Sequence, residues 1–460
     1  MPPDTALLSG WGRTAPSACR LVEAPGAGLV EHLESLLAGA GDGLLARGLG
    51  RSYGDAAQCA GGTVVDLTGA DAILEVDAAS RRVRAQAGVS LEGLLLSLLP
   101  LGLFPPVTPG TRWVTVGGAI ASDVHGKNHH KEGSFGSWVS ALTLVSPATG
   151  ARRIGPDGRD EDRNLFWATV GGMGLTGIVA DAEVSMLAVE TSRIRVDTER
   201  ASDLEQLMAR MTATDHRYRY SVAWVDASAR GRHLGRSVLS QGDHATVDEL
   251  APRERSPERA LAFRPAATVA PPPWVPSGLL NGATARAFNG AWYRHAPRQE
   301  TGRLVPLEHF FYPLDRVRDW NRLYGHLGFV QYQLVVPFGA EDQLRWALER
   351  LAGSGLPPLL AVLKRFGDPD PGPLSFPVPG WTLALDLPAG RPGLGELLDE
   401  LDEVVVGAGG RVYLAKDARL RPELVEAMYP RLSEWRAVRG RADPDGVLRS
   451  DLGRRLGLVR

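Results

Sequence analysis

Residues 46–55 read Ala-Arg-Gly-Leu-Gly-Arg-Ser-Tyr-Gly-Asp, and residues 109–120 read Pro-Gly-Thr-Arg-Trp-Val-Thr-Val-Gly-Gly-Ala-Ile. Glycine lets the backbone approach an anion closely and adopt positive φ, so bare N–H groups can face phosphate oxygens. Neither stretch is a P-loop, because no Gly-Lys-Ser/Thr follows, and neither has the Rossmann spacing G-x-G-x-x-G. Two such turns, about sixty residues apart, can hold one long diphosphate cofactor from both ends. The run 115–121 is expected to begin a helix whose free N–H groups meet the pyrophosphate.

Bulk composition narrows the class of protein. The length of 460 residues suggests two or three domains, and 44% hydrophobic with 23% charged residues is typical of a globular protein. A formal net charge of −2 argues against a nucleic-acid-binding protein. The two cysteines, Cys19 and Cys59, cannot build a disulfide framework. Neither a signal peptide nor a run of about 18 apolar residues is visible, so the expected location is cytoplasmic.

The pattern of predicted secondary structure changes near residue 190. From about 44 to 190, short β-type runs at 63–67, 82–87, 140–146 and 177–186 alternate with helical stretches, including a helix over 91–99 with Ser90 as N-cap. Longer alternating strands and amphipathic helices follow. We therefore predict a first domain over 1–190, a second over 191–410, and a C-terminal return to the first domain over 411–460.

One proline-rich segment interrupts the second domain. Residues 265–278 carry five prolines, each of which removes a backbone donor and restricts its predecessor. A long loop of this kind is either a surface excursion or a lid.

Three runs in the second domain alternate with a period of two. Val330, Tyr332, Leu334 and Val336 share one face of a strand, with Gln331 and Gln333 on the other. In 381–387 the leucines share a face, which leaves Thr382, Ala384 and Asp386 opposite, and Leu360, Val362, Lys364 and Phe366 align likewise. The pattern predicts an antiparallel sheet with an apolar face on helices and a polar face towards the cofactor.

The two glycine turns, with Gly-Gly-Met-Gly-Leu-Thr-Gly-Ile at 171–178, resemble the FAD-binding domain of the vanillyl-alcohol-oxidase superfamily. The resemblance implies an α+β fold: a two-part FAD-binding domain of the vanillyl-alcohol-oxidase type, plus a substrate domain on an antiparallel sheet with helices on one face. Carried over position by position, the expected FAD contacts are Ala46, Arg47, Gly48, Leu49, Gly50, Arg51, Ser52, Tyr53, Gly54, Asp55, Ala56, Gly110, Thr115, Val116, Gly117, Gly118, Ser122, Asp123, Val124, His125, Ile178 and Tyr413.

The residue after the first glycine turn bears on how FAD is held. Many members of this superfamily attach the flavin through a histidine at this position. This chain has Arg51, which cannot form that bond. Non-covalent FAD is therefore expected.

Further motifs narrow the resemblance. The run Ser-Asp-Val-His-Gly-Lys-Asn-His-His at 122–130, Leu-Phe-Trp-Ala-Thr-Val-Gly-Gly at 165–172 and Ala-Lys-Asp at 415–417 resemble the decaprenylphosphoryl-β-D-ribose 2′-oxidase family. That family supplies the flavin subunit of the epimerase that makes the arabinose donor of actinobacterial cell walls. The resemblance implies oxidation of the C2 hydroxyl of a polyprenylphosphoryl-β-D-ribose, a separate NADH-dependent short-chain reductase as partner, and a quinone, a dye or oxygen as electron acceptor. A lipid substrate also implies peripheral contact with a membrane, at either face.

The same resemblance assigns roles to side chains. Lys416 is expected at the reactive edge of the flavin as the base or alkoxide-holding group, with His125 and Tyr53 as the other catalytic residues. Strict alternation would put Tyr413 and Lys416 on opposite faces, so the strand must bend after Ala415. Mycobacterial relatives have cysteine where this chain has Ala384. The expected substrate contacts are Lys127, Tyr312, Gln331, Gln333, Lys364, Ala384, Asp386 and Lys416.

Other functions compete with this interpretation. His125, His129 and His130 suggest a metal site, but no carboxylate or cysteine stands at ligand spacing and Lys127 would repel a cation; we expect no metal. The nearest alternative is a superfamily oxidase of a soluble sugar alcohol or aldonolactone. A third is a non-catalytic flavoprotein that binds a glycolipid or a partner protein.

Overall fold

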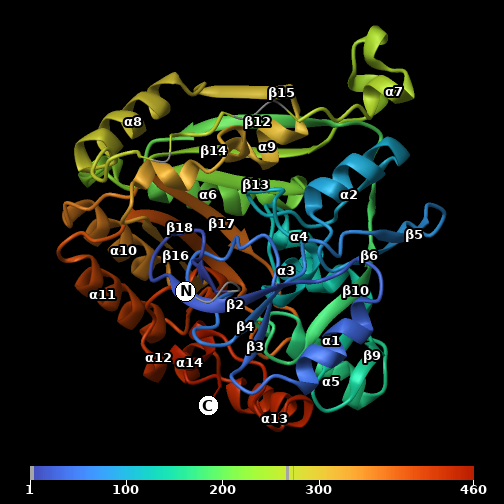
Figure 1. Ribbon diagram of the computed structural model, residues 1–460. Coiled ribbons are helices and arrows are strands. Elements are labelled where there is room, and N and C mark those ends of the chain that lie inside the picture. The colour runs from blue at the N-terminus through green and yellow to red at the C-terminus, as the bar shows by residue number, and fades with distance from the viewer. Residues whose placement is uncertain (1–4, 266–268, 273, 460) are drawn as a thin grey trace.

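The computed structural model describes residues 5–265, 269–272 and 274–459, and they form the expected α+β fold. The first part of the chain builds two sheets, blue to green in Figure 1. A mixed sheet has the strand order β1-β2-β4-β3, and an antiparallel sheet has the order β5-β6-β10-β8-β9. Their strands are β1 (Thr5–Leu8), β2 (Ser17–Glu23), β3 (Leu44–Arg47), β4 (Thr63–Asp66), β5 (Ile73–Asp77), β6 (Arg82–Gln86), β8 (Val139–Ser146), β9 (Gly150–Ile154) and β10 (Ile178–Ser185).

Short helices connect and cover these strands. The predicted helix start is confirmed at Ser90, whose side chain accepts a hydrogen bond from the Gly93 N–H and so caps α2. A two-residue ribbon pairs β7 (Leu103–Phe104) with β11 (Leu187–Ala188). The helices are α1 (Leu29–Ala38), α2 (Leu91–Leu98), α3 (Val116–Ala121), α4 (His129–Glu132) and α5 (Asp160–Thr169).

The second part of the chain is built on one antiparallel sheet of eight strands. Its strand order is β15-β12-β14-β13-β17-β18-β16-β19. The strands are β12 (Arg193–Ala201), β13 (Tyr220–Val225), β14 (Ser237–His244), β15 (Gln299–Pro306), β16 (Phe329–Pro337), β17 (Leu360–Phe366), β18 (Gly380–Pro388) and β19 (Arg411–Val412). The helices of this part are α6 (Leu204–Thr214), α7 (Pro257–Ala260), α8 (Gly282–His295), α9 (Leu307–Phe311), α10 (Glu341–Gly353) and α11 (Leu394–Gly407).

The two faces of this sheet differ as the alternation predicts. Gln331 stands opposite Asp386, and Gln333 opposite Ala384, on neighbouring strands. The alternate residues Leu383 and Leu385 are fully buried in the main core, which also contains the apolar side of α11. That side repeats leucine at three- and four-residue spacing, as a helix facing a core requires. The opposite face is left for polar side chains.

The C-terminal residues pack against the first part of the chain. Three helices, α12 (Pro422–Met428), α13 (Leu432–Ala442) and α14 (Asp451–Arg455), are drawn in red at the bottom of Figure 1, below the blue strands. The indole N–H of Trp435 donates to the Ala168 carbonyl at 3.0 Å. The Leu44 N–H donates to the Val447 carbonyl at 2.9 Å. These contacts support the predicted return over 411–460, while the division into domains stays a prediction.

A double ion pair ties α14 to two distant loops. Arg455 donates two hydrogen bonds to the Asp55 carboxylate, at 2.8 and 2.9 Å. Its Nη1 lies 2.9 Å from Oδ2 of Asp417, a buried residue next to Lys416. The guanidinium thus joins the first glycine loop, the Lys416 turn and the C-terminal helix.

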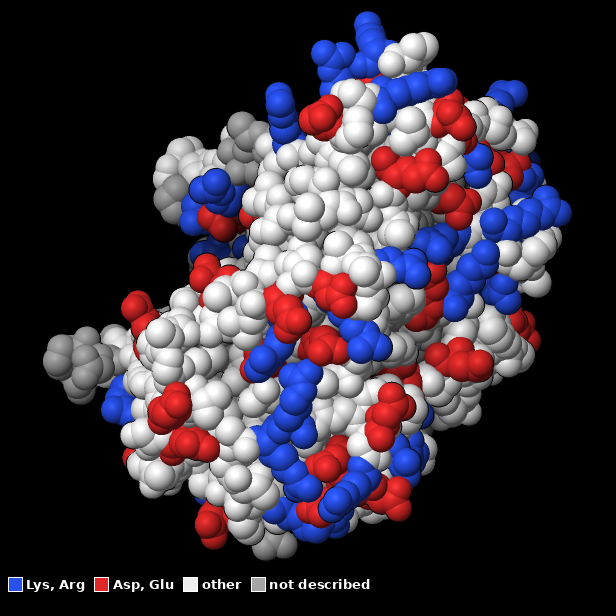
Figure 2. Space-filling view, turned by 90° about the vertical axis from the view of Figure 1, so that its right-hand side faces the viewer, with Lys and Arg blue, Asp and Glu red and all other residues white. Residues whose placement is uncertain are grey.

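The segment 265–278 forms little regular structure. Residues 266–268 and 273 of this predicted loop lie outside the described residues. Val269 makes an isolated bridge with Val317, and Trp274 is 77% exposed. Over the described residues, no helix is both long and apolar enough to cross a membrane. Figure 2 shows basic and acidic side chains interspersed over one face of the molecule, without the single-sign stripe that a nucleic-acid-binding groove requires.

We predict that Arg455→Met lowers stability by about 2–4 kcal/mol, because it leaves the two carboxylates close to each other without a counter-charge. The midpoint of thermal unfolding, measured on the protein with its cofactor, is expected to fall by several degrees. Arg441→Met, on the exposed side of α13, is the matched control and should leave the midpoint unchanged. Equal midpoints for the two variants would contradict the structural role of Arg455.

Candidate active site

The first glycine turn presents unbonded backbone donors. β3 ends at Arg47, and among the hydrogen bonds of the described residues none is donated by the backbone N–H groups of residues 48–52. Gly50 has φ +62°, which favours glycine. A Cβ atom on Gly48 would lie 2.2 Å from Oγ1 of Thr115, so no larger residue fits there. Successive free N–H groups in a glycine turn form a concavity suited to an anion.

The second glycine turn differs from the prediction. The N–H of Val116 donates to the Val89 carbonyl, and that of Gly117 donates to the Ala87 carbonyl, each at 2.8 Å. The Gly118 N–H donates to the side chain of Thr115, which caps α3. The expectation of free N–H groups at this helix start is therefore wrong, because the turn that follows β6 and the Thr115 cap already accept their hydrogen bonds. Residues 115–118 instead pack beside the first glycine turn, where Thr115 lies against Gly48.

The segment after α3 is held from several sides. The Gly171 N–H donates to the Ile120 carbonyl, and the Met173 N–H to the Ala121 carbonyl. Tyr413 donates its hydroxyl hydrogen to the Ser122 carbonyl at 2.6 Å. Burial and the neighbouring carboxyl group of Asp370 raise the pKa of Asp123 well above its usual value. Burial also raises the pKa of Asp370, so a proton is retained between the two carboxyl groups more readily than on isolated acids.

His125 lies at the centre of a polar and aromatic cluster. The amide of Gln333 donates to Nε2 of His125 at 3.0 Å and to Oγ1 of Thr382 at 2.9 Å. The ring of His125 lies 5.0 Å from that of Tyr413, between ring centroids. Burial, followed by the nearby ammonium groups of Lys364 and Lys416, lowers the pKa of His125 well below its usual value. The imidazole is therefore neutral, and its Nδ1 is a buried atom without a protein partner.

Three lysines converge beside this cluster. Burial lowers the pKa of Lys416 to about 8, against the attraction of Asp386. Burial also lowers the pKa of Lys127 to about 8; its Nζ donates to the Phe311 carbonyl at 3.0 Å. The pKa of Lys364 is lowered well below its usual value by burial and by repulsion from both other lysines. The site therefore concentrates positive charge away from water.

Asp386 is the acid among these lysines. Gln331 donates its amide hydrogen to Oδ1 of Asp386 at 2.5 Å, from the directly opposite position on β16. Burial raises the pKa of Asp386 to about 6, so the carboxyl group is ionised at neutral pH. Oε1 of Gln331 and Oε1 of Gln333 are buried acceptors without a protein partner. Buried acceptors of this kind normally have a partner, and a hydroxyl or ring N–H group of a bound molecule would satisfy them.

The chain bends before Lys416, but earlier than predicted. β19 ends at Val412, and residues Leu414–Lys416 form one tight helical turn closed by a hydrogen bond from the Lys416 N–H to the Tyr413 carbonyl. The bend therefore starts after Tyr413, not after Ala415. It lets Tyr413 reach Ser122 while Nζ of Lys416 lies 5.5 Å from the ring centre of Tyr53. Both side chains serve the same site.

Other predicted residues occupy more peripheral positions. Tyr312 is fully buried and shares a hydrogen bond of 2.7 Å with Thr108. Arg51 stacks on Trp11, with its guanidinium carbon 3.8 Å from the ring centre. His129 accepts a hydrogen bond from the Gly367 N–H, and His130 lies at hydrogen-bonding distance from two carbonyl groups. Both histidines therefore have ordinary structural hydrogen bonds, although they lie in the short helix α4 and not in a loop.

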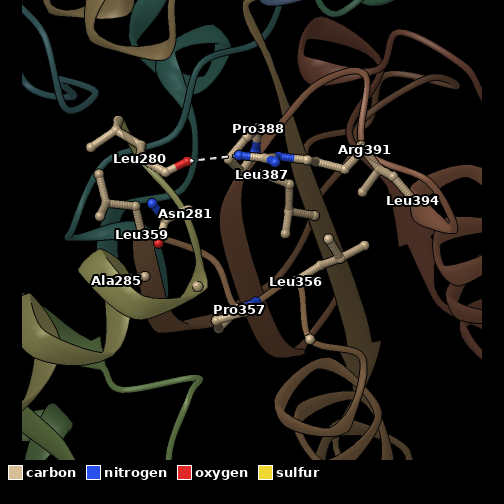
Figure 3. Close-up of a pocket in the computed structure, with 12 residues that line it drawn as sticks. Leu280, Asn281, Ala285, Leu356, Pro357, Leu359, Leu387, Pro388, Arg391 and Leu394 are labelled. Atoms are coloured by element: carbon tan, nitrogen blue, oxygen red, sulfur yellow. Dashed lines mark hydrogen bonds between the residues drawn. The ribbon is translucent and has the colours of Figure 1, made fainter. Parts of the chain in front are cut away.

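Two cavities lie near the ends of the site. One of about 370 Å³ borders the first glycine turn; its lining includes Trp11, Arg47, Gly50 and Arg322. The other, of about 90 Å³, is apolar and lies at the start of α8, where Leu280, Leu359 and Leu387 surround it (Figure 3). Arg391 is the sole titratable residue in the lining of this second cavity, so the cavity is unsuited to catalysis.

Sequence reasoning missed several residues of the site. Thr382 was placed on the correct face without a role, and its hydroxyl fixes the Gln333 amide. Asp370 and Arg455 come from segments without a recognisable motif. Only a covarying pair in an alignment could have signalled the partnership of Arg455 with Asp55.

Comparisons with known proteins bear on the identity of this site. A family model described as FAD binding domain matches residues 31–154, and one described as D-arabinono-1,4-lactone oxidase matches residues 390–456. The chain is 42% identical to the decaprenylphosphoryl-beta-D-ribose oxidase of Mycolicibacterium smegmatis over 461 aligned residues. This alignment covers 100% of this chain and 99% of that protein.

Two further relatives show how far the similarity extends. An uncharacterized protein of Streptomyces coelicolor is 44% identical over 379 residues, which is 80% of this chain and 100% of that protein. An L-galactono-1,4-lactone dehydrogenase of Oryza sativa subsp. japonica is 30% identical over 197 residues, 42% of this chain and 32% of that protein. Similarity to the lactone dehydrogenase is thus partial.

The cofactor of this chain is FAD, and the residues present fit it. The FAD-binding match spans both glycine turns and His125. The unbonded N–H groups of residues 48–52 suit a pyrophosphate, and Gly48 lets this turn pack closely against Thr115 of the second turn. Nδ1 of His125 and the two glutamine oxygens are buried polar atoms that lack protein partners, as expected beside a polar ring system.

Proposed function

Because the chain belongs to the decaprenylphosphoryl-β-D-ribose oxidase family, we propose that it oxidises the C2 hydroxyl of a polyprenylphosphoryl-β-D-ribose to the 2′-keto sugar. This oxidation is the first half of the epimerisation that yields the arabinose donor for cell-wall polysaccharide. The observation that carries the proposal is the convergence of Lys127, Lys364 and Lys416 with Asp386 in one buried site.

The charge of the site fits a phosphoryl sugar. Burial, followed by repulsion from Lys416 and Lys127, lowers the pKa of Lys364, and one carboxyl group, that of Asp386, acts on Lys416. A bound phosphodiester anion would supply the missing negative charge in a site of low dielectric. A neutral polyol or lactone would leave the excess positive charge unbalanced. The strand register places Gln331, Asp386 and Ala384 on one sheet face, so two side chains with hydrogen-bonding groups and one small side chain lie side by side there.

The roles of the side chains follow from their positions. FAD, when bound, supplies the acceptor for the hydride that leaves the sugar carbon. Lys416, with a pKa lowered to about 8, is the group that takes or holds the hydroxyl proton. Tyr53 lies against Lys416, and Gln333 orients the neutral His125 towards the same volume. Gln331 fixes the Asp386 carboxylate, whose charge attracts the Lys416 side chain and counteracts the lowering of its pKa.

A partner is required to complete epimerisation. The keto sugar must be reduced on the opposite face, and we assign that step to a separate NADH-dependent short-chain reductase. A quinone, a dye or oxygen reoxidises the flavin. Since the substrate is a lipid, we also propose that the protein works peripherally at a membrane.

A FAD-dependent oxidase of an aldonolactone is the alternative function. It is favoured by the match of residues 390–456 to the D-arabinono-1,4-lactone oxidase family model. The full-length similarity to the ribose-lipid oxidase and the lysine cluster weigh against it.

We propose that FAD is held without a covalent bond, because Arg51 follows the first glycine turn. Acid precipitation is expected to release all the yellow colour into the supernatant. Flavin that remained in the washed pellet, detected by its fluorescence in a denaturing gel, would refute non-covalent binding.

Anaerobic mixing of the yellow protein with a short-chain polyprenylphosphoryl ribose tests the function directly. We expect rapid bleaching of the visible flavin band and its return when a quinone or dye is added. D-arabinono-1,4-lactone is the matched comparison. Bleaching by the lactone alone would transfer the assignment to the alternative function.

Lys416→Ala is predicted to lower turnover by about 10²–10⁴-fold, because general-base catalysis contributes that much, while FAD stays bound. In the unaltered protein, kcat/KM should rise with pH and level off above about 8, since only the neutral amine accepts a proton and the pKa of Lys416 is about 8. Lys131→Ala, an exposed lysine near the same site, is the control. Full turnover of the Lys416 variant, or a rate that falls as pH rises from 6 to 8, would exclude the role.

A further inference from the structure

Helix α8 has its large apolar side chains on the outside. Its buried residues are Ala285, Asn289 and Gly290. Phe288 and Trp292, one helical turn apart, are 50% and 51% exposed and stack on each other with ring centroids 6.1 Å apart. A helix on the surface of a globular protein normally shows the opposite pattern. The outward face of α8 therefore suits an apolar environment better than water does.

The surroundings of this face are basic. Residues 279–299, which comprise α8 and its flanks, contain three arginines, Arg286, Arg294 and Arg298, and no aspartate or glutamate. Arg286 and Arg294 are exposed on α8, and among the described residues neither forms an ion pair. Aromatic side chains flanked by unpaired arginines match the boundary between the acyl chains and the headgroups of an anionic bilayer.

The start of α8 adds an apolar recess. Leu279, just before the helix, is 52% exposed. The 90 Å³ cavity of Figure 3 opens beside Leu280 and Ala285, and Arg391 crosses its rim to donate to the Leu280 carbonyl at 3.4 Å. A guanidinium group at the mouth of an apolar recess suits a phosphate headgroup above an acyl chain.

Helix α8 also touches the sheet that carries the lysines. The ring of Trp292 lies 6.4 Å from that of Trp224 on β13. Trp224 is directly opposite Val362 on β17, and Val362 shares a strand face with Lys364, two residues away. The exposed helix therefore lies over the same face of the sheet that carries Lys364, at the outer edge of the molecule in Figure 1.

We propose that α8, with Leu279 and the two arginines Arg286 and Arg294, is the surface by which the protein docks on a membrane that carries anionic lipids; we call it the α8 surface. Phe288 and Trp292 enter the acyl-chain boundary, and the arginines contact phosphate groups. This docking rests on the proposed function in one respect, since it gives a lipid substrate a short route to the lysines. The binding itself needs no substrate.

Vesicle sedimentation tests the docking. The FAD-loaded full-length protein is mixed with vesicles of phosphatidylcholine alone, or of equal parts phosphatidylcholine and phosphatidylglycerol. We expect binding to the anionic vesicles and much less to the neutral ones. F288S/W292S should weaken binding on the order of tenfold, and R286Q/R294Q on the order of twentyfold, since each arginine near an anionic surface contributes about fivefold.

Matched controls keep the test specific. L96S/L101S removes two exposed leucines on and just after α2, and R159Q/R441Q removes two exposed arginines elsewhere. Both controls should bind anionic vesicles like the unaltered protein. All variants should retain FAD absorbance and the turnover of a detergent-solubilised short-chain substrate, whereas turnover of a substrate embedded in vesicles should fall only in the α8 variants.

The outcomes separate docking from the proposed function. Vesicle binding that is lost in the α8 variants, in a protein that never oxidises the ribose lipid, would support docking and refute the function. Equal binding by the α8 and control variants would overturn the docking proposal whatever the turnover. Failure to bind vesicles, together with a dimer that F288S/W292S dissociates, would also overturn the proposal. In that case a second copy of the chain would bind the α8 surface.

Discussion

The double ion pair of Arg455 is the constraint that assembles the site. The glycine turn at 48–52, the Lys416 turn and the C-terminal helix come from three distant parts of the chain, and no shared strand joins them. One guanidinium bridges the carboxylates of Asp55 and Asp417. Because Asp417 directly follows Lys416, this bridge, together with the hydrogen bond from the Tyr53 N–H to the Ala415 carbonyl, holds the Lys416 turn beside the first glycine turn. Arginine suits the task, since its rigid fork can bind one carboxylate with two bonds and still reach another.

The fold also maintains an uneven charge balance around the substrate. Removing an ammonium group from water is costly, and here three lysines are buried, with Asp386 near Lys416 and Asp315 near Lys127. Contacts with the surrounding structure hold the buried groups in place. Gln331 donates to Asp386, Lys127 donates to the Phe311 carbonyl, and Lys364 lies on a strand paired with β18. Lowered lysine pKa values are the result of the burial, and they are also what a base near neutral pH requires. The same burial therefore lowers the stability of the fold and makes the lysines more reactive.

The sequence predicted local features well and long-range partners poorly. Alternation with a period of two placed Gln331, Gln333 and Asp386 on one sheet face, because side-chain direction in a strand depends only on position. The cap at Ser90 could be predicted because it also depends only on residues close to each other in the sequence. The free donors expected at α3 were wrong, since residues 87 and 89 accept those hydrogen bonds. The pairing of Asp123 with Asp370, like that of Asp55 with Arg455, depends on tertiary contacts that no local pattern records.

The separation of Asp55 from Arg455 has a consequence for biosynthesis. The two residues are 400 positions apart in the chain. At the usual pace of translation, Asp55 leaves the ribosome roughly 20–80 s before its partner. For most of that interval the ion pair with Arg455 cannot form and the Lys416 turn has not been synthesised. The contact between the glycine turn and α14 is therefore among the last contacts of the molecule to form.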